Sequence, residues 1–182
     1  MAEKLATYAT RAGVLDVDLI TDAYHIAVRP RLAFLPDVFH PDVLHPARTI
    51  LILLEDTDCR DSRVLAAAAL TETLEPAMRV GAEDVGALGS DVAQMVAAVP
   101  SPLDVSEDTL AEALVTADQD AALIAVAERL DHARHLHMRE RDLWAPYHAL
   151  TVSIYLPLAA RLSAELTRRL ERWAWSFERR LS

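Results

Sequence analysis

The sequence predicts a single-domain, all-α helical bundle over residues 1–182. At this length the chain can bury a hydrophobic core within one domain. It is 52% hydrophobic, yet it has only 5% aromatic residues and 4 glycines. Alanine and leucine, which are strong helix formers, are abundant among its apolar residues. This composition favours helices almost throughout the chain.

Helical spacing of apolar residues and local capping signals place the helices of the first half. Residues 29–45, with Pro46 just beyond, hold four prolines and predict an irregular, ordered loop. Pro46 can open the next helix, because the first helical turn does not need its N–H. Asp58 or Asp61 is expected to cap the helix after that. The predicted helices are 3–12, 16–28, 46–56, 62–76 and 82–99.

Breaking and capping residues also define the second half. Pro100 and Pro102 end the preceding helix, and Ser106 precedes two acidic residues that suit a helix N-terminus. Pro157 is expected to bend the last helix, because it lacks a backbone N–H. The predicted helices are 107–117, 119–137, 140–145 and 147–181.

An apolar stripe runs along the last predicted helix. Its members recur every three or four residues, which is typical of one helix face. They are Leu162, Leu166, Leu170, Trp173, Phe177 and Leu181. The stripe either packs into the core or forms the seam of a homodimer, because Trp and Phe favour interfaces.

Charge and composition exclude several classes of partner. The net charge is −10, with 28 acidic against 18 basic residues, so the surface should repel nucleic-acid phosphates. The longest strongly apolar run, Ile50–Leu54, is far shorter than the ~20 residues of a membrane span. Cys59 is the single cysteine, which fits a reducing compartment. We therefore expect a cytoplasmic protein that binds neither nucleic acid nor membranes.

Four segments carry a resemblance to a known family. They are PDVLHPART (41–49), VLAAAALTETLEP (64–76), LIAVAERLDHARHL (123–136) and TVSIYLPLAARL (151–162). In this order they resemble the HD-domain hydrolases of the Rel/SpoT type, which cleave the alarmone (p)ppGpp. The resemblance covers about residues 18–170 and implies a helical bundle of the HD-domain type. The last predicted helix continues beyond this range, to residue 181.

The resemblance also implies a metal site. In the family one Mn²⁺ is held by a first His, by an adjacent His-Asp pair and by a distant Asp. His45 matches the first His and Thr71 replaces the second, while Glu72 and Glu128 replace the two aspartates. A threonine hydroxyl is a poor ligand compared with an imidazole. The implied cofactor is Mn²⁺ or another divalent ion, or none if the shell has been lost.

The catalytic pair of the family is altered as well. In the family an adjacent Glu-Asp pair helps to activate the attacking water. Glu75 keeps the Glu of this pair, but Pro76 stands where the Asp would be. Glu75 and Glu72 are therefore the candidate catalytic carboxylates, in a site that the substitutions indicate to be degenerate.

One helix offers a replacement ligand. Glu128, His132 and His135 lie at positions i, i+4 and i+7, so they can share one helix face. His132 could replace the ligand lost at Thr71. The rebuilt shell would consist of His45, Glu72, Glu128 and His132. Alternatively, His132, His135 and His137 form a polar patch at the end of a helix.

Further residues are candidates for substrate binding. Arg29 and Arg31 precede the first block, in a stretch that grips guanine and phosphates in the family. The candidate substrate contacts are Arg29, Arg31, Arg134, Thr151, Tyr155 and Arg161. The last-block residues could instead pack the final helix, and Arg48, Arg134 or Arg161 could neutralise buried carboxylates if no metal is present.

Three functional hypotheses remain open. The preferred one is a catalytically impaired relative of the (p)ppGpp hydrolases that acts as a ligand- or protein-binding module. The second is an active metal-dependent phosphohydrolase with a remodelled shell, acting on (p)ppGpp, another guanine nucleotide or a different phosphorylated small molecule. The third is a structural or oligomerising helical domain.

Overall fold

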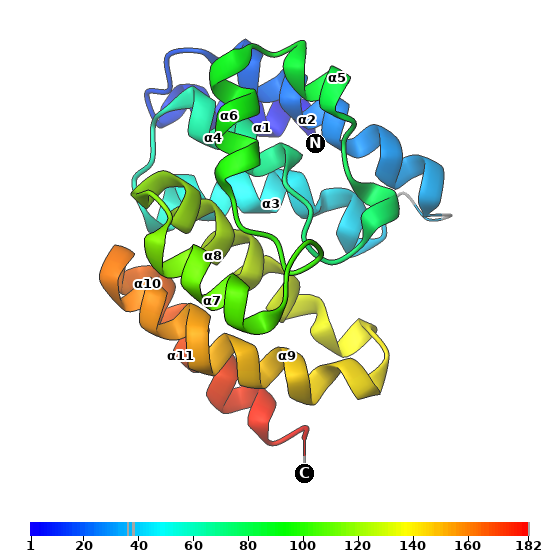
Figure 1. The fold of residues 1–182 in the computed structure, drawn as a ribbon. Coiled ribbons are helices and arrows are strands. Elements are labelled where there is room, and N and C mark those ends of the chain that lie inside the picture. The colour runs from blue at the N-terminus through cyan, green and yellow to red at the C-terminus, as the bar shows by residue number, and fades with distance from the viewer. Residues whose placement is uncertain (36, 38, 182) are drawn as a thin grey trace.

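The computed structural model describes residues 1–35, 37 and 39–181, and it confirms the all-α class (Figure 1). Over these residues the chain contains no β-strand. Nor does any helix in this described part combine the length and apolar character needed to cross a membrane. The α-helices are α1 (Ala2–Arg11), α2 (Val17–Phe34), α3 (Pro41–Asp56), α4 (Ser62–Leu70), α5 (Ala82–Gly86), α6 (Ser90–Ala98), α7 (Glu107–Thr116), α8 (Gln119–His135), α9 (Trp144–Leu150), α10 (Leu156–Leu162) and α11 (Ala164–Glu178). Short 3₁₀ turns lie at Pro76–Met78, Leu136–Met138 and Arg141–Leu143, and a π-helical turn lies at Thr151–Tyr155.

The Ala-rich helix α4 is packed among other helices in the upper half of the view in Figure 1. It packs against α2, α3, α6 and α8, and each of its residues except Arg63 is buried. Four consecutive alanines, Ala66–Ala69, are fully buried. Their small side chains let the neighbouring helices approach closely. On the other side of α8 lie α10 and α11, so α8 is covered on both sides.

The proline-rich segment is more helical than its composition predicts. Helix α2 continues through Pro30 to Phe34, and α3 begins at Pro41 rather than at Pro46. The loop predicted over residues 29–45 was therefore wrong at both ends, while residues 36 and 38 lie outside the described part. Pro41 occupies the first turn of α3, where its missing N–H costs nothing. Burial of the first turns stabilises α3 despite the internal Pro46.

Helix α4 ends six residues earlier than predicted. Its last residue is Leu70, and Thr71 already has an extended backbone conformation. The Thr71 hydroxyl donates to the Ala67 carbonyl at 2.9 Å, which caps the helix end. Glu72 and Glu75 therefore lie beyond α4, and not within the predicted helix 62–76. At the start of this helix, Asp61 rather than Asp58 is the cap, since it accepts from the Arg63 N–H.

The long C-terminal helix is interrupted once, at Ser163, which has an extended backbone. Before this break, α9 runs through the π-helical turn into α10, and Pro157 lies just after that turn. The Ser163 hydroxyl accepts from the Leu166 N–H and donates to the Asp56 carbonyl, which ties this corner to α3. Helix α11 ends at Glu178, short of the predicted position 181.

The predicted helix over 82–99 is also divided. Its two parts, α5 and α6, are separated by a turn at Gly89. The φ angle of Gly89 is +109°, a conformation that side chains disfavour. The remaining helix positions of the second half agree with the prediction to within a few residues, and Ser106 caps α7.

The apolar stripe of α11 packs within the chain. Leu166, Leu170, Trp173 and Phe177 are buried, which confirms core packing for these four residues. Leu162 and Leu181 are half-buried. The homodimer through α11 stays a prediction. It would have to use the surface of α11 that is not buried within the chain.

Candidate metal centre

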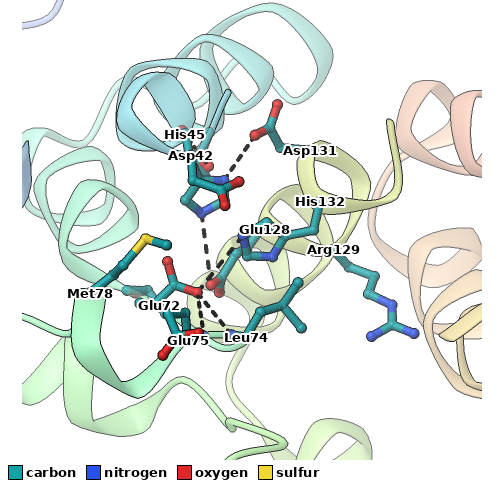
Figure 2. A network of polar contacts seen from close by, with 12 residues as sticks. Asp42, His45, Glu72, Leu74, Glu75, Met78, Glu128, Arg129, Asp131 and His132 are labelled. Carbon is teal, nitrogen blue, oxygen red and sulfur yellow. Dashed lines mark hydrogen bonds and ion pairs between the residues drawn. The ribbon is translucent and has the colours of Figure 1, made fainter. Parts of the chain in front are cut away.

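Four polar side chains from three separate segments meet in the interior of the bundle (Figure 2). His45 comes from α3, Glu72 follows α4, and Glu128 and His132 lie one turn apart on α8. Each of these residues is at most 4% exposed. His45 Nε2 lies 3.8 Å from Glu128 Oε1, and His132 Nε2 lies 3.9 Å from Glu72 Oε1. The structure therefore brings together the four residues of the predicted rebuilt shell, which we call the His₂Glu₂ cluster.

The two histidine rings of the cluster are stacked. Their centroids are 4.1 Å apart and their planes differ by 9°. Burial lowers the pKa of His132 well below its usual value, and the charge of His45 lowers it further. Burial also disfavours a charged His45, but its contacts with Asp131 and Glu128 outweigh this and raise its pKa to about 9. His132 is therefore a neutral imidazole with a free lone pair, as a metal ligand must be.

Several atoms of the cluster are buried without a hydrogen-bond partner. They are His45 Nε2, both carboxylate oxygens of Glu128 and both ring nitrogens of His132. Burial raises the pKa of Glu128, because a desolvated carboxylate resists ionisation. Unpaired polar atoms are costly in a protein interior and call for a missing partner.

The arrangement could hold a divalent ion. One donor atom each from His45, Glu72 and His132 lies within 4.8 Å of the other two. Glu128 Oε1 is a further possible ligand atom, because it lies 3.8 Å from His45 Nε2. Imidazole and carboxylate ligands bind transition ions at about 2.0–2.2 Å, so a small inward movement would let them share one ion.

Glu72 is held in place by a fully buried arginine and by the backbone. Its Oε2 accepts from Arg31 Nη2 at 3.0 Å. Its Oε1 accepts from the N–H groups of Leu74 and Glu75, at 2.8 and 3.2 Å. Arg31, expected as a substrate contact, is 0% exposed and neutralises Glu72 instead. Since a carboxylate oxygen accepts about two hydrogen bonds, Oε1 is fully used and one acceptor position remains on Oε2.

His45 is oriented by a residue that the sequence reasoning missed. Its Nδ1 donates to Asp131 Oδ2 at 2.8 Å. Arg48 grips the same carboxylate with two donors, Nε to Oδ1 at 2.7 Å and Nη2 to Oδ2 at 2.8 Å. Although burial opposes it, these contacts hold the pKa of Asp131 well below its usual range. The sequence feature that could have identified Asp131 is its spacing. It lies three residues after Glu128 on the same helix, so both side chains can face α3.

Three other candidate residues near the cluster form hydrogen bonds with backbone groups. The Thr71 hydroxyl caps α4 and is not directed to the cluster as a ligand. Glu75 Oε1 accepts from the Ala77 N–H, which caps the 3₁₀ turn at Pro76–Met78. His135 donates to the Asp131 carbonyl at 3.0 Å and stays half-buried outside the cluster. Glu75 thus caps a turn, and its catalytic role stays a prediction.

The remaining substrate candidates do not converge on the cluster. Arg29 is exposed and pairs with Asp84 at 3.3 Å, and Arg134 is exposed as well. Arg161 lines a separate depression between α7 and α10. Thr151 and Tyr155 are buried, but they surround another arginine instead.

That arginine is Arg129, the neighbour of Glu128 on α8. Its Nε donates to Thr151 Oγ1 at 2.8 Å, and its guanidinium lies 4.6 Å from the centre of the Tyr155 ring. It also stacks at 3.3 Å on the ring of Tyr147. Thr151 and Tyr155 thus anchor α8 to the C-terminal helices, which is the packing role considered as the alternative.

A cavity of about 330 Å³ lies beside the cluster. Thr71 and Glu72 contribute to its wall, which is otherwise mostly aliphatic. At its polar edge Arg79 pairs with Asp104 at 2.6 Å and donates to Ser101 at 2.8 Å. The cavity therefore touches the cluster only through Glu72, and the arginine on its wall is already paired.

Fold and site together define a class of protein: an all-α domain with a buried centre of two histidines and two glutamates. No protein-family model and no curated protein matches the chain.

Proposed function

We propose that this protein is a divalent-metal-binding helical domain, related to the HD-type (p)ppGpp hydrolases but impaired in catalysis, that acts as a ligand- or protein-binding module. One observation carries the proposal. Buried, unpaired donor atoms of His45, Glu128 and His132 face one another next to Glu72. Three of these four residues occupy positions that match or replace metal ligands in the family that the sequence resembles.

The balance of buried charge supports an ion. Arg31 neutralises Glu72, and Arg48 neutralises Asp131. Glu128 has no such arginine, and its nearest cationic partner is His45 at 3.8 Å, without a hydrogen bond. A metal ion would displace the proton from His45 and satisfy Glu128 at the same time, because metal binding and proton release are coupled.

The ligand set favours some metals over others. Two imidazoles with carboxylates suit Zn²⁺, Fe²⁺, Co²⁺ or Mn²⁺. Mg²⁺ and Ca²⁺ prefer shells made entirely of oxygen atoms. Bound here, such an ion would supply Lewis acidity to anything that reached it.

Impaired catalysis is supported by the closure of the site. The cluster residues are at most 4% exposed, so a phosphate ester has no direct approach to them. The two carboxylate positions of the family's catalytic pair are occupied by Glu75, which caps a turn, and by Pro76. An ion in this setting would mainly tie α3, α8 and the segment after α4 together.

Metal analysis of the purified protein tests the proposal. We expect close to one equivalent of a transition ion per chain, by inductively coupled plasma mass spectrometry after loading and desalting. His132→Gln should lose most of it, because glutamine cannot replace an imidazole ligand. His135→Gln, one turn further along α8, is the matched control and should bind like the wild type. A wild-type protein that stays metal-free after incubation with Zn²⁺ and Mn²⁺ would contradict the proposal.

The second candidate is an active phosphohydrolase with a remodelled shell. The observation in its favour is the 330 Å³ cavity, because Glu72 belongs to both the cavity wall and the cluster. A guanine nucleotide or another phosphorylated molecule would have to enter there.

An activity assay separates the two candidates. From the closed site we expect no turnover of (p)ppGpp or p-nitrophenyl phosphate by the Mn²⁺- or Zn²⁺-loaded protein, followed by chromatography and absorbance. Hydrolysis that disappears in His132→Gln but persists in His135→Gln would establish the active candidate and overturn the impaired one.

A further inference from the structure

We infer that Asp131, gripped by Arg48, is a positioning residue that holds the His45 ring with Nε2 turned into the metal centre. The inference rests on the proposed function, because it assigns the group that would set the direction of one ligand. It adds to the cluster two residues that do not themselves touch the ion.

The contacts form an uninterrupted chain from the surface of α3 to the interior. Arg48 is half-buried and donates to Asp131 through two nitrogens, at 2.7 and 2.8 Å. Its Nη2 also donates to the Pro41 carbonyl at 2.7 Å, which fixes the guanidinium against the start of α3. Asp131, fully buried on α8, then accepts from His45 Nδ1 at 2.8 Å.

This chain of contacts decides which nitrogen of His45 is free. Since Nδ1 is committed to Asp131, Nε2 is the atom left for a ligand, and it is unpaired and buried. A flip of the ring would break the bond to Asp131 and turn Nε2 away from Glu128, which lies 3.8 Å from it. A carboxylate that receives the other N–H of a ligating histidine fixes its tautomer and raises its basicity.

The arrangement is more specific than an ion pair that merely joins two helices. Arg48 and Asp131 alone would connect α3 to α8. The shared oxygen Oδ2, however, accepts from both Arg48 and His45. Asparagine has nearly the same shape, but it cannot replace all three hydrogen bonds. Whichever way its amide is turned, the NH₂ group faces a donor: Arg48 Nε in place of Oδ1, or Arg48 Nη2 and His45 Nδ1 in place of Oδ2.

The test measures Co²⁺ binding to the full-length protein by visible absorption, which reports the ligand geometry. For Asp131→Asn we expect an apparent Kd for Co²⁺ weakened by ~10–100-fold and an altered absorption spectrum. Asp131→Glu, which keeps the carboxylate, should recover part of the affinity.

The matched control is Asp56→Asn. Asp56 forms another ion pair between two helices, with Arg169, and its side chain is only 7% exposed. It has no contact with the cluster among those described, so its loss should lower stability without changing the affinity for Co²⁺ or the spectrum.

The possible failures can be told apart. If the wild type binds no Co²⁺, the proposed function and this inference both fall. If Asp131→Asn binds Co²⁺ with the wild-type affinity and spectrum, only the positioning role is overturned.

A second measurement covers an Asp131 variant that does not fold. In the Zn²⁺-loaded wild type, ¹⁵N NMR should show Nδ1 of His45 protonated and Nε2 bound to metal. The opposite assignment would overturn the inference without any substitution.

Discussion

Replacing Arg31 with methionine is expected to destabilise the metal-free protein by about 3–5 kcal/mol, because it would strand a buried carboxylate. The side chains of Arg31 and Glu72 are 0% and 2% exposed, and Nη2 lies 3.0 Å from Oε2. Methionine keeps much of the volume of arginine but removes its charge. The two backbone N–H groups on Glu72 would remain, yet they do not replace a counter-charge. Urea unfolding followed by circular dichroism measures the loss.

The same helix provides the control. Arg29 lies two residues earlier and pairs with Asp84, but these side chains are 63% and 52% exposed. Such exposed pairs contribute about 0–1 kcal/mol, so Arg29→Met should have a small effect. The double variant Arg31→Met with Glu72→Gln should recover much of the stability, since it removes the stranded charge. An Arg31→Met protein as stable as Arg29→Met would show that the buried pair does not form.

The second large effect is expected from the metal itself. An ion that binds only the folded state stabilises it by about 4 kcal/mol at a free concentration one thousand times Kd. For a chain of this size, each kcal/mol raises the Tm by roughly 2–4 °C. Saturating Zn²⁺ or Mn²⁺ should therefore raise the Tm by roughly 8–16 °C in differential scanning fluorimetry, relative to protein treated with a chelator.

Two histidine variants make this measurement specific. His45→Gln should abolish the shift, because His45 supplies a buried nitrogen without a protein hydrogen-bond partner. His148→Gln is the control: it removes a partly buried histidine that donates to the Ala174 carbonyl, in the apolar cluster of α9 and α11. A Tm that does not respond to either metal in the wild type would contradict an ion in the His₂Glu₂ cluster.

Local sequence patterns determined the helical class and many helix positions. Helices α7 and α8 lie within two residues of their predicted bounds, and Ser106 caps α7 as expected. Such features depend on spacing and capping over a few residues. The resemblance to a family indicated His45, Glu72 and Glu128 as candidate ligands, and the helical spacing from Glu128 added His132.

Helix boundaries at the prolines depended on tertiary packing. Pro46 lies inside α3 because burial of the surrounding turns compensates for its missing N–H. Helix α4 ends early, at Leu70, and the extended backbone from Thr71 onward places Glu72 against Arg31. A local pattern carries no information on which turn will be buried against another helix.

By itself, the sequence determined that this chain forms helices, because helix formation depends on residue type and short-range spacing. It indicated candidate ligands mainly through its resemblance to a family. Only the tertiary structure decided how these residues are held. Asp131 meets His45 across 86 positions of sequence, and Arg31 reaches Glu72 across 41. Tertiary packing also places Thr151 and Tyr155 against Arg129 rather than against a ligand. Contacts of this kind arise when distant helices pack and a buried charge must find its partner there.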